Sequence, residues 1–185
     1  MREEDGGRRA ARPLPLLIGF GAFLVVMAYL VAASFTRRTA PAFAASTEAR
    51  GDTITVDATD GRRWRYVSLT RGRVLAGPDT AAWEIAVRRY NVIANGDAVD
   101  LGAGSFDAVR EVPPVADEAN GSAIPRWYRY NLLTHLLEPT GHVYAVRAGS
   151  GPTYKVQILS YYCPGLTAGC MTLRFAPLMR ASATE

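Results

Sequence analysis

The sequence has few of the residues that enzymes and metal sites usually need. Its 185 residues contain two cysteines, two histidines and a single lysine. It has no nucleophile-elbow, zinc-protease or phosphate-loop motif, and Gly102 with Gly104 does not extend into a dinucleotide-binding fingerprint. Because so little is available for nucleophilic or general-base chemistry, we predict that the chain is not an enzyme. Neither histidine has the spacing of a metal ligand, so we also predict no metal site.

Charge of either sign is missing from one long stretch, Leu14–Phe35. A helix of these 22 residues would be about 33 Å long, at about 1.5 Å per residue, which is enough to cross the hydrocarbon core of a bilayer. We therefore predict a single transmembrane helix. Arginines are more numerous before it than directly after it, which predicts a cytoplasmic N-terminus and a periplasmic C-terminal domain at a bacterial inner membrane. The arginines counted are Arg2, Arg8, Arg9 and Arg12 before the helix and Arg37 and Arg38 after it.

A cleaved signal peptide is the alternative to a retained anchor. Ala42, Phe43 and Ala44 form a small-x-small pattern that resembles a cleavage site. The apolar run is longer than that of a signal peptide, and an arginine pair separates it from the pattern. These two features favour a retained anchor.

Small residues recur on one side of the predicted helix. Gly21, Ala28 and Ala32 follow one another at intervals of seven and four, which places them on one helical face. Such a face allows close packing against another membrane helix. The alternative is that glycine and alanine are simply common in membrane helices.

The only two cysteines, Cys163 and Cys170, lie seven positions apart with a Pro-Gly pair between them. An even count and an extracytoplasmic location predict a disulfide that closes a loop between two strands. Two reduced thiols are the alternative if the topology is inverted. The chain is only mildly basic, with a formal net charge of +4 spread along it, so we predict no nucleic-acid partner.

The remainder of the chain has the pattern of antiparallel β-structure, with short alternating runs separated by Gly, Pro, Asn and Asp. We predict loops over 97–125 and a short helical turn over 131–137. The predicted domains are a polar cytoplasmic arm (1–13), the transmembrane helix (14–35), a linker (36–51) and a periplasmic β-domain (52–185). The predicted strands cover 53–57, 62–70, 83–88, 92–95, 127–130, 143–147, 153–162 and 170–175.

Several of these strand segments together resemble the HmuY-like family. The resemblance spans residues 53–177 and implies a mainly β fold, a mostly antiparallel domain with a few short helices. Known members of that family are bacterial surface lipoproteins that bind haem and catalyse nothing. This chain departs from them because a predicted membrane helix takes the place of the lipid anchor. The segments that carry the resemblance are 83–90 followed by Asn95-Gly96, 127–130, 144–147, 155–158 with Tyr161-Tyr162, and 171–175.

The resemblance implies histidine or methionine as haem ligands. His135 and His142 are the candidates, with Met171 and Met179 as weaker ones. If the chain doubles back near Pro139, both histidines would face one cleft and would clamp an iron atom between them. The alternative is two ordinary surface histidines, because the sequence around them indicates no second shell of supporting groups.

Two functions follow from these features. The first is a non-catalytic accessory subunit of a larger membrane complex, photosynthetic or respiratory, with lipids and other subunits as partners and no expected cofactor. The alternative is a membrane-tethered periplasmic protein with haem as cofactor and partner. We predict that aromatic and arginine side chains form the interface with these subunits, since protein interfaces are enriched in both residue types. The alternative is that the same side chains pack in the core of the sheet or lie on its solvated face. These side chains are Trp64, Tyr66, Arg88, Trp127 and Tyr128.

Overall fold

A computed structural model describes residues 14–35, 40–78, 83–111, 122–149 and 151–179. The chain divides into two compact units at residues 38 and 39, and each unit is described here by itself. The predicted polar arm over 1–13 and the start of the predicted linker lie outside the described residues.

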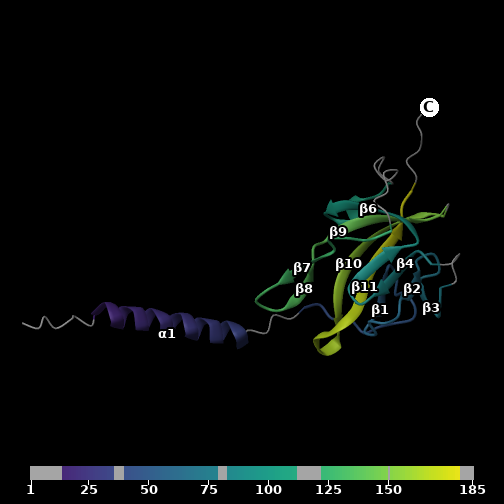
Figure 1. Cartoon of the computed structure of the whole chain (residues 1–185). Coiled ribbons are helices and arrows are strands. Elements are labelled where there is room, and N and C mark those ends of the chain that lie inside the picture. Colours follow the sequence, from purple (N-terminus) through teal and green to yellow (C-terminus); the bar gives the residue numbers. More distant parts are fainter. Residues whose placement is uncertain (1–13, 36–39, 79–82, 112–121, 150, 180–185) are drawn as a thin grey trace, which may run out of the picture. The chain divides into compact units, whose positions relative to one another are not determined.

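The first unit contains one helix, α1 (Leu14–Phe35), whose bounds match the prediction (Figure 1). The described side chains of α1 are exposed, including Ala28 and Ala32, and a Cβ atom added at Gly21 would meet nothing within 4 Å. The role of these small residues in packing therefore stays a prediction. Among the residues that the structure describes, no helix is long and apolar enough to cross a membrane. The helix is confirmed, and its transmembrane role is not supported by this finding.

The larger sheet of the second unit has five antiparallel strands in the order β1-β11-β10-β9-β6. Its two long central strands, β10 and β11, are joined by the disulfide between Cys163 and Cys170, which confirms that prediction. The 3-10 helix η3 (Pro164–Leu166) lies between the two cysteines. The strand bounds are Thr53–Asp57 for β1, Thr167–Pro177 for β11, Thr153–Cys163 for β10, His142–Ala148 for β9 and Gly96–Ala103 for β6.

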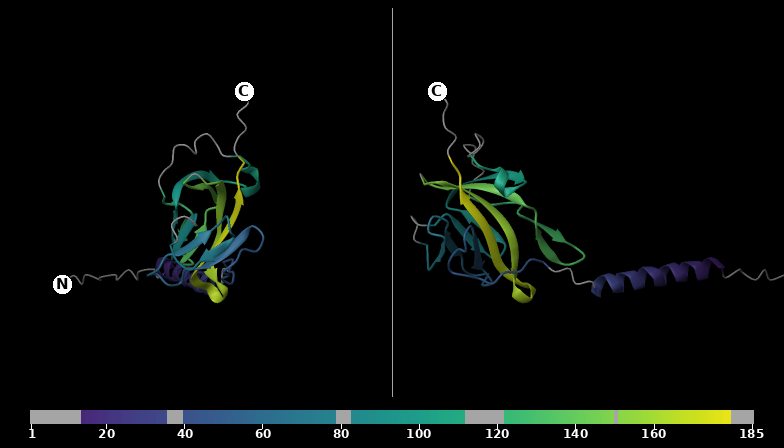
Figure 2. Two further views of the ribbon diagram at one scale, coloured as in Figure 1. Left: turned by 90° about the vertical axis from the view of Figure 1, so that its right-hand side faces the viewer. Right: turned by 180° about the vertical axis from the view of Figure 1, so that it is seen from behind.

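A smaller antiparallel sheet has the order β3-β2-β4-β5, and a separate hairpin is formed by β7 and β8. Figures 1 and 2 show β2, β3 and β4 beside β1 and β11, with the β7–β8 hairpin on the opposite side of β10. Another 3-10 helix, η1 (Phe106–Ala108), follows β6. The bounds are Arg65–Ser68 for β2, Arg73–Leu75 for β3, Ile85–Arg88 for β4, Asn91–Ala94 for β5, Tyr128–Asn131 for β7 and Leu136–Pro139 for β8.

One hydrophobic core lies between the two sheets. Val56, Val146 and Val156 from the larger sheet and Val67 and Val87 from the smaller one are completely buried within the same cluster. Branched side chains favour strands because they pack well on a pleated surface. The core therefore accounts for the alternation on which the strand predictions were based, and the mainly β fold with one long helix is confirmed.

Three predictions about local structure need correction. Residues 97–103, predicted as loop, form most of β6, and residues 131–137, predicted as a helical turn, form a tight turn and the start of β8. The predicted linker is also part of the domain from residue 40 onward, because Phe43 N donates a hydrogen bond to the Tyr162 carbonyl and Ser46 N donates to that of Thr55. For β6 and the linker, pairing with distant strands overrides the local sequence preference, whereas β8 pairs with the neighbouring strand β7.

Candidate functional site

A β-bulge at the edge of the larger sheet brings Asp100 on β6 to His142 at the start of β9. The register shifts between Asp100 and Ala103, and Gly102 occupies the bulge with φ +83°. Glycine adopts this left-handed conformation without a steric penalty. The Gly102 N–H donates to Asp100 Oδ1 over 2.9 Å, which fixes the carboxylate beside the histidine.

His142 and Asp100 form a close pair. His142 Nδ1 lies 2.8 Å from Asp100 Oδ1 and 3.0 Å from Oδ2. Their side chains are only 20% and 16% exposed, so the pair is shielded from much of the solvent. A carboxylate bound to one ring nitrogen fixes the tautomer and orientation of a histidine and makes the other nitrogen a better ligand. Nε2 is the nitrogen that this pairing leaves for a ligand.

A cavity of about 450 Å³ lies beside this pair, and Tyr144 forms part of its wall. The Tyr144 hydroxyl donates to the Pro125 carbonyl over 2.6 Å. Burial, with a smaller effect from the negative charge of Asp100, raises the pKa of this phenol well above its usual range, while Arg126 opposes the rise. The hydroxyl therefore remains a neutral donor. The full lining is Ala98, Asp100, Gly102, Ala123, Pro125, Arg126, His142 and Tyr144.

The opposite wall is the segment that precedes β7. Ile124 N donates to the Val92 carbonyl over 3.0 Å, and Thr140 Oγ1 donates to the Arg126 carbonyl over 2.6 Å. Arg126 has φ +58°, a strained conformation for a residue with a side chain, and such residues often occur at ligand sites. Its exposed guanidinium places a positive charge at the cavity.

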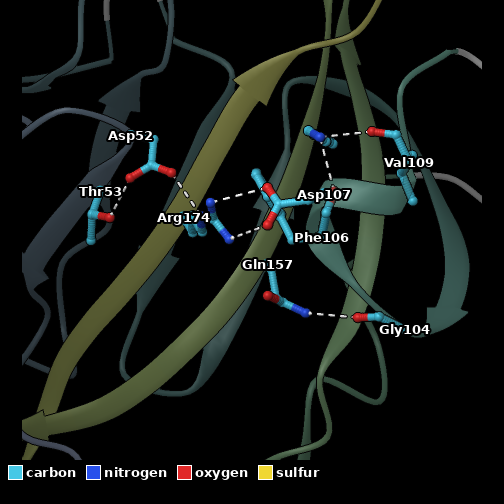
Figure 3. Close-up of polar contacts among 9 residues, drawn as sticks. Asp52, Thr53, Gly104, Phe106, Asp107, Val109, Gln157 and Arg174 are labelled. Atoms are coloured by element: carbon cyan, nitrogen blue, oxygen red, sulfur yellow. Dashed lines mark hydrogen bonds and ion pairs between the residues drawn. The ribbon is translucent and has the colours of Figure 1, made fainter.

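Gln157 on β10 supports the backbone on both sides of the site. Its side-chain amide donates to the Gly141 carbonyl over 2.9 Å. The same amide donates to the Gly104 carbonyl over 3.4 Å, the contact drawn in Figure 3. Gly141 precedes His142, and Gly104 follows the β6 bulge. One side chain therefore ties together the two segments that position His142 and Asp100.

The structure does not bring His135 and His142 together. His135 lies in the turn at the tip of the β7–β8 hairpin, where its Nδ1 is 2.6 Å from the Tyr130 hydroxyl. The four extended residues of β8 separate it from the end of the hairpin at which β9 begins, a span of about 13 Å at about 3.3 Å per residue. His135 lines neither of the two cavities described here, so the chain does not double back to form a cleft between the two histidines.

The two methionines differ in their surroundings, and neither lines the cavity. Met171 is completely buried in the core between the sheets, while Met179 is 68% exposed. Met171 would reach a ligand only if the core opened. Among the described residues, no group of three or more His, Cys, Asp or Glu side chains is placed to hold a metal ion.

The predicted interface residues separate into two groups. Trp127 is only 3% exposed and donates its indole N–H to the Tyr90 carbonyl, so it has the competing role of a core residue, and its interface role stays a prediction. Trp64, Arg88 and Tyr128 are half-buried and line a second cavity of about 490 Å³. Tyr66 is half-buried with its ring 5.1 Å from that of Trp83.

Sequence reasoning found His142 but missed Asp100, Arg126 and Tyr144 as parts of one site. Asp100 belongs to the strand that was predicted as loop, and Arg126 follows a proline in an irregular segment. Their closeness depends on the β6–β9 register, which no local pattern specifies. Tyr144 was predicted only as one aromatic residue of a strand, and nothing in the sequence marked it as a site residue.

The fold is similar to solved structures of three bacterial proteins. A Bacteroides fragilis lipoprotein is 20% identical, with 75% of this chain and 96% of that chain covered and a TM-score of 0.55. The apo form of a Tannerella forsythia HmuY analogue is 16% identical, with 69% and 95% covered and a TM-score of 0.56. An HmuY-like haem-binding protein from Bacteroides vulgatus is 19% identical, with 71% and 96% covered and a TM-score of 0.53.

These likenesses show that the domain has the HmuY-like fold, as the sequence resemblance implied. No family model matches the chain, and no curated protein matches it. At identities of this size the similarity concerns the fold alone, and the function has to be argued from the site.

Proposed function

We propose that this chain is a non-catalytic haem-binding protein in which His142 binds the iron. The observation that carries the proposal is the pairing of His142 Nδ1 with Asp100 at 2.8 Å beside a cavity. Histidine ligands of metals usually donate their second N–H to a carboxylate in this way. The description of the similar Bacteroides vulgatus protein as HmuY-like and haem-binding supports the same interpretation.

The residues around the cavity suit a flat ligand that is apolar apart from its acidic groups. Ala98, Pro125 and Tyr144 supply apolar wall, and Arg126 supplies a positive charge that would pair with a propionate. Haem would contribute an iron atom that accepts a nitrogen ligand. The side chains of this site would hold the group through His142 and Arg126, while Asp100 holds the imidazole in position.

The distance between the histidines predicts the type of haem spectrum. Because His135 lies at the far end of the hairpin, only one histidine is available at the cavity. We therefore expect a high-spin spectrum with a single histidine ligand and not the low-spin spectrum of a bis-histidine centre.

A haem titration of the full chain in mild detergent, followed by absorbance, tests this proposal. We expect a saturable Soret shift with one haem per chain and its loss in His142→Ala. Asp100→Asn should weaken binding by about 10- to 100-fold, the usual effect of removing the partner of a ligating histidine. His135→Ala is the matched control and should bind haem like the parent.

Two outcomes would contradict the proposal. One is an unchanged titration in His142→Ala, and the other is a low-spin spectrum that disappears in His135→Ala. Circular dichroism of each variant separates lost ligation from lost folding.

We further propose that α1 anchors the domain at a bacterial inner membrane, with the domain in the periplasm. The proposal depends on the sequence, whose 22-residue uncharged segment is flanked by arginines. A disulfide in the domain suits an oxidising compartment.

The accessory-subunit function remains a second candidate. The comparisons give it no support, and the haem-binding alternative agrees better with the similar structures. One specific observation favours it: four of the five predicted interface residues line one cavity.

A further inference from the structure

We propose that the second cavity is a docking site for an acidic segment of another protein. The cavity has a volume of about 490 Å³ and lies between β4, β5 and the segment before β7. Its lining includes Trp64, Arg88, Tyr90, Arg126 and Tyr128 but no aspartate or glutamate. The proposal does not depend on haem binding.

The two arginines give the cavity a positive charge that no carboxylate in the described part of the chain neutralises by an ion pair. Neither Arg88 nor Arg126 forms an ion pair with a carboxylate in the parts of the chain that the structure describes. The Arg88 guanidinium lies 4.6 Å from the centre of the Trp64 ring, which holds it in place while its N–H groups remain available at its edge. A carboxylate is a group that such a fixed guanidinium binds strongly.

The aromatic residues around the arginines have the features of an interface. Tyr90 is 47% exposed, and its ring lies 6.1 Å from that of Tyr128 in an edge-to-face arrangement. Buried Trp127 supports both tyrosines, because its indole N–H donates to the Tyr90 carbonyl over 2.9 Å and its ring lies 4.7 Å from that of Tyr128. A rigid aromatic rim with arginine is typical of the residues that contribute most to protein–protein binding.

An acidic protein segment fits these observations better than a small anion. The exposed Tyr90 and Arg126 continue the cavity onto the open surface, where a chain with an acidic side chain would lie across the tyrosines. Trp64, Arg88 and Tyr128 come from three separate strands or strand flanks, so the patch exists only in the folded domain.

A peptide titration of the full chain in detergent tests the proposal. The probe is acetyl-Glu-Tyr-Glu-amide, and the control peptide has glutamine in place of both glutamates. The readout is the NMR signal of the Trp64 indole N–H, with Trp83 as an internal reference outside the cavity. We expect a saturable shift with the acidic peptide that weakens as salt is raised, and little shift with the neutral one.

Arg88→Gln should lower the affinity for the acidic peptide by about tenfold or more, because a charge-assisted hydrogen bond is lost. Arg110→Gln removes the same charge at an exposed position outside the cavity and should leave the affinity unchanged. Equal binding of the two peptides, or an unaltered affinity in Arg88→Gln, would overturn the proposal. The salt dependence of the parent protein tests it independently of whether the variant folds.

The result is separable from the haem proposal. His142→Ala should lose haem and retain the peptide, and Arg88→Gln should lose the peptide and retain haem. Arg126 lines both cavities, so Arg126→Gln should weaken the binding of both haem and the acidic peptide.

Discussion

Tyr144 connects the chemistry of the candidate site with the stability of the domain. Its ring is only 1% exposed, and its hydroxyl holds Pro125 in the opposite wall of the cavity. Burial raises the pKa of this phenol well above its ordinary value of about 10. The folded protein therefore resists an ionisation that the unfolded chain undergoes at moderately alkaline pH.

This difference predicts alkaline destabilisation. Below about pH 10 the phenol is neutral in both states, and its full contribution to stability is present. As the pH rises above this value, the unfolded state loses its proton first, so the free energy of unfolding should fall by up to about 1.4 kcal/mol per pH unit. Urea denaturation between pH 8 and 11 measures this slope.

Tyr144→Phe removes the ionisable group and should make the slope shallower. Tyr161, whose pKa burial also raises, should retain its own contribution. Tyr90→Phe is the control, because it removes an exposed hydroxyl. A slope that Tyr144→Phe leaves unchanged would show that this residue is not the source of the effect.

Individual residues were predicted from the sequence where their chemistry was distinctive. The two cysteines and His142 stand out because so few such residues are present. Asp100 and Arg126 do not, since aspartate and arginine are common and only the β6–β9 bulge and the wall before β7 place them near His142. Trp127 was named as an interface candidate with core packing as its competing role, because composition alone does not separate a buried tryptophan from an exposed one.

Among the elements, η1 is held on the larger sheet by two cations, the single lysine of the chain and Arg174. Lys155 on β10 is 8% exposed, and its Nζ donates to the carbonyls of Phe106 and Val109 over 2.9 and 2.7 Å. Arg174 on β11 pairs with Asp107 in η1 and with Asp52 before β1 (Figure 3). Both cations also lie over the Phe106 ring, at 4.4 and 4.3 Å from its centre.

Lys155→Met should destabilise the domain by about 3 kcal/mol or more. Methionine fills a similar volume but leaves two carbonyls without a donor, and hydrogen bonds from charged groups contribute about 1.5 to 3 kcal/mol each. Urea denaturation at neutral pH measures the loss, and Arg110→Met, at an exposed position, should change stability by less than about 0.5 kcal/mol. A loss in Lys155→Met as small as that of the control would show that η1 is held by other contacts.

Amine labelling checks the same contact in the parent protein. Lys155 is the only side-chain amine, so its reaction with an amine-specific reagent, separated from that of the N-terminal amine by peptide mapping, reports on this one element. We expect protection in the folded state and reaction on unfolding.

The elements that the sequence predicted well are those with their own hydrophobic alternation. The bounds of β1 were predicted without error, and β9, β10 and β11 were predicted with ends a few residues short. β6 was missed because GDAVDLGA contains two glycines and two aspartates, and it is a strand because β9 pairs with it. Leu132 and Leu133 suggested a helical turn, yet they are 77% and 83% exposed at the tip of the β7–β8 hairpin.

For the whole molecule, an apolar helix and a β-domain with its own core follow one another in the chain. The sequence predicted this division from a single shift in composition at residue 35. It did not predict that residues 40 to 51 bind to the domain, because those bonds join backbone atoms, as between Ala49 N and the Gly72 carbonyl.

The proposed anchor predicts how the full chain behaves in cells. Expressed in bacteria, it should float with membranes after an alkaline carbonate wash, because about 20 apolar residues suffice to hold a protein in a bilayer. Deletion of residues 14–35 should release the domain into the aqueous fraction. Added protease should reach the domain only after the outer membrane has been opened. A full-length chain that the wash removes would contradict the anchor.

The neighbour of β1 in the larger sheet also constrains the order of events during synthesis. β1 is the first strand of the domain, and its partner β11 is the last, with Thr53 opposite Arg174 and Asp57 opposite Cys170. The earliest segment therefore has no place in the sheet until the latest one has been made. A nascent chain that stops before residue 167 leaves β1 without its partner strand, so Ile54 and Val56 lack the strand beside which they are buried.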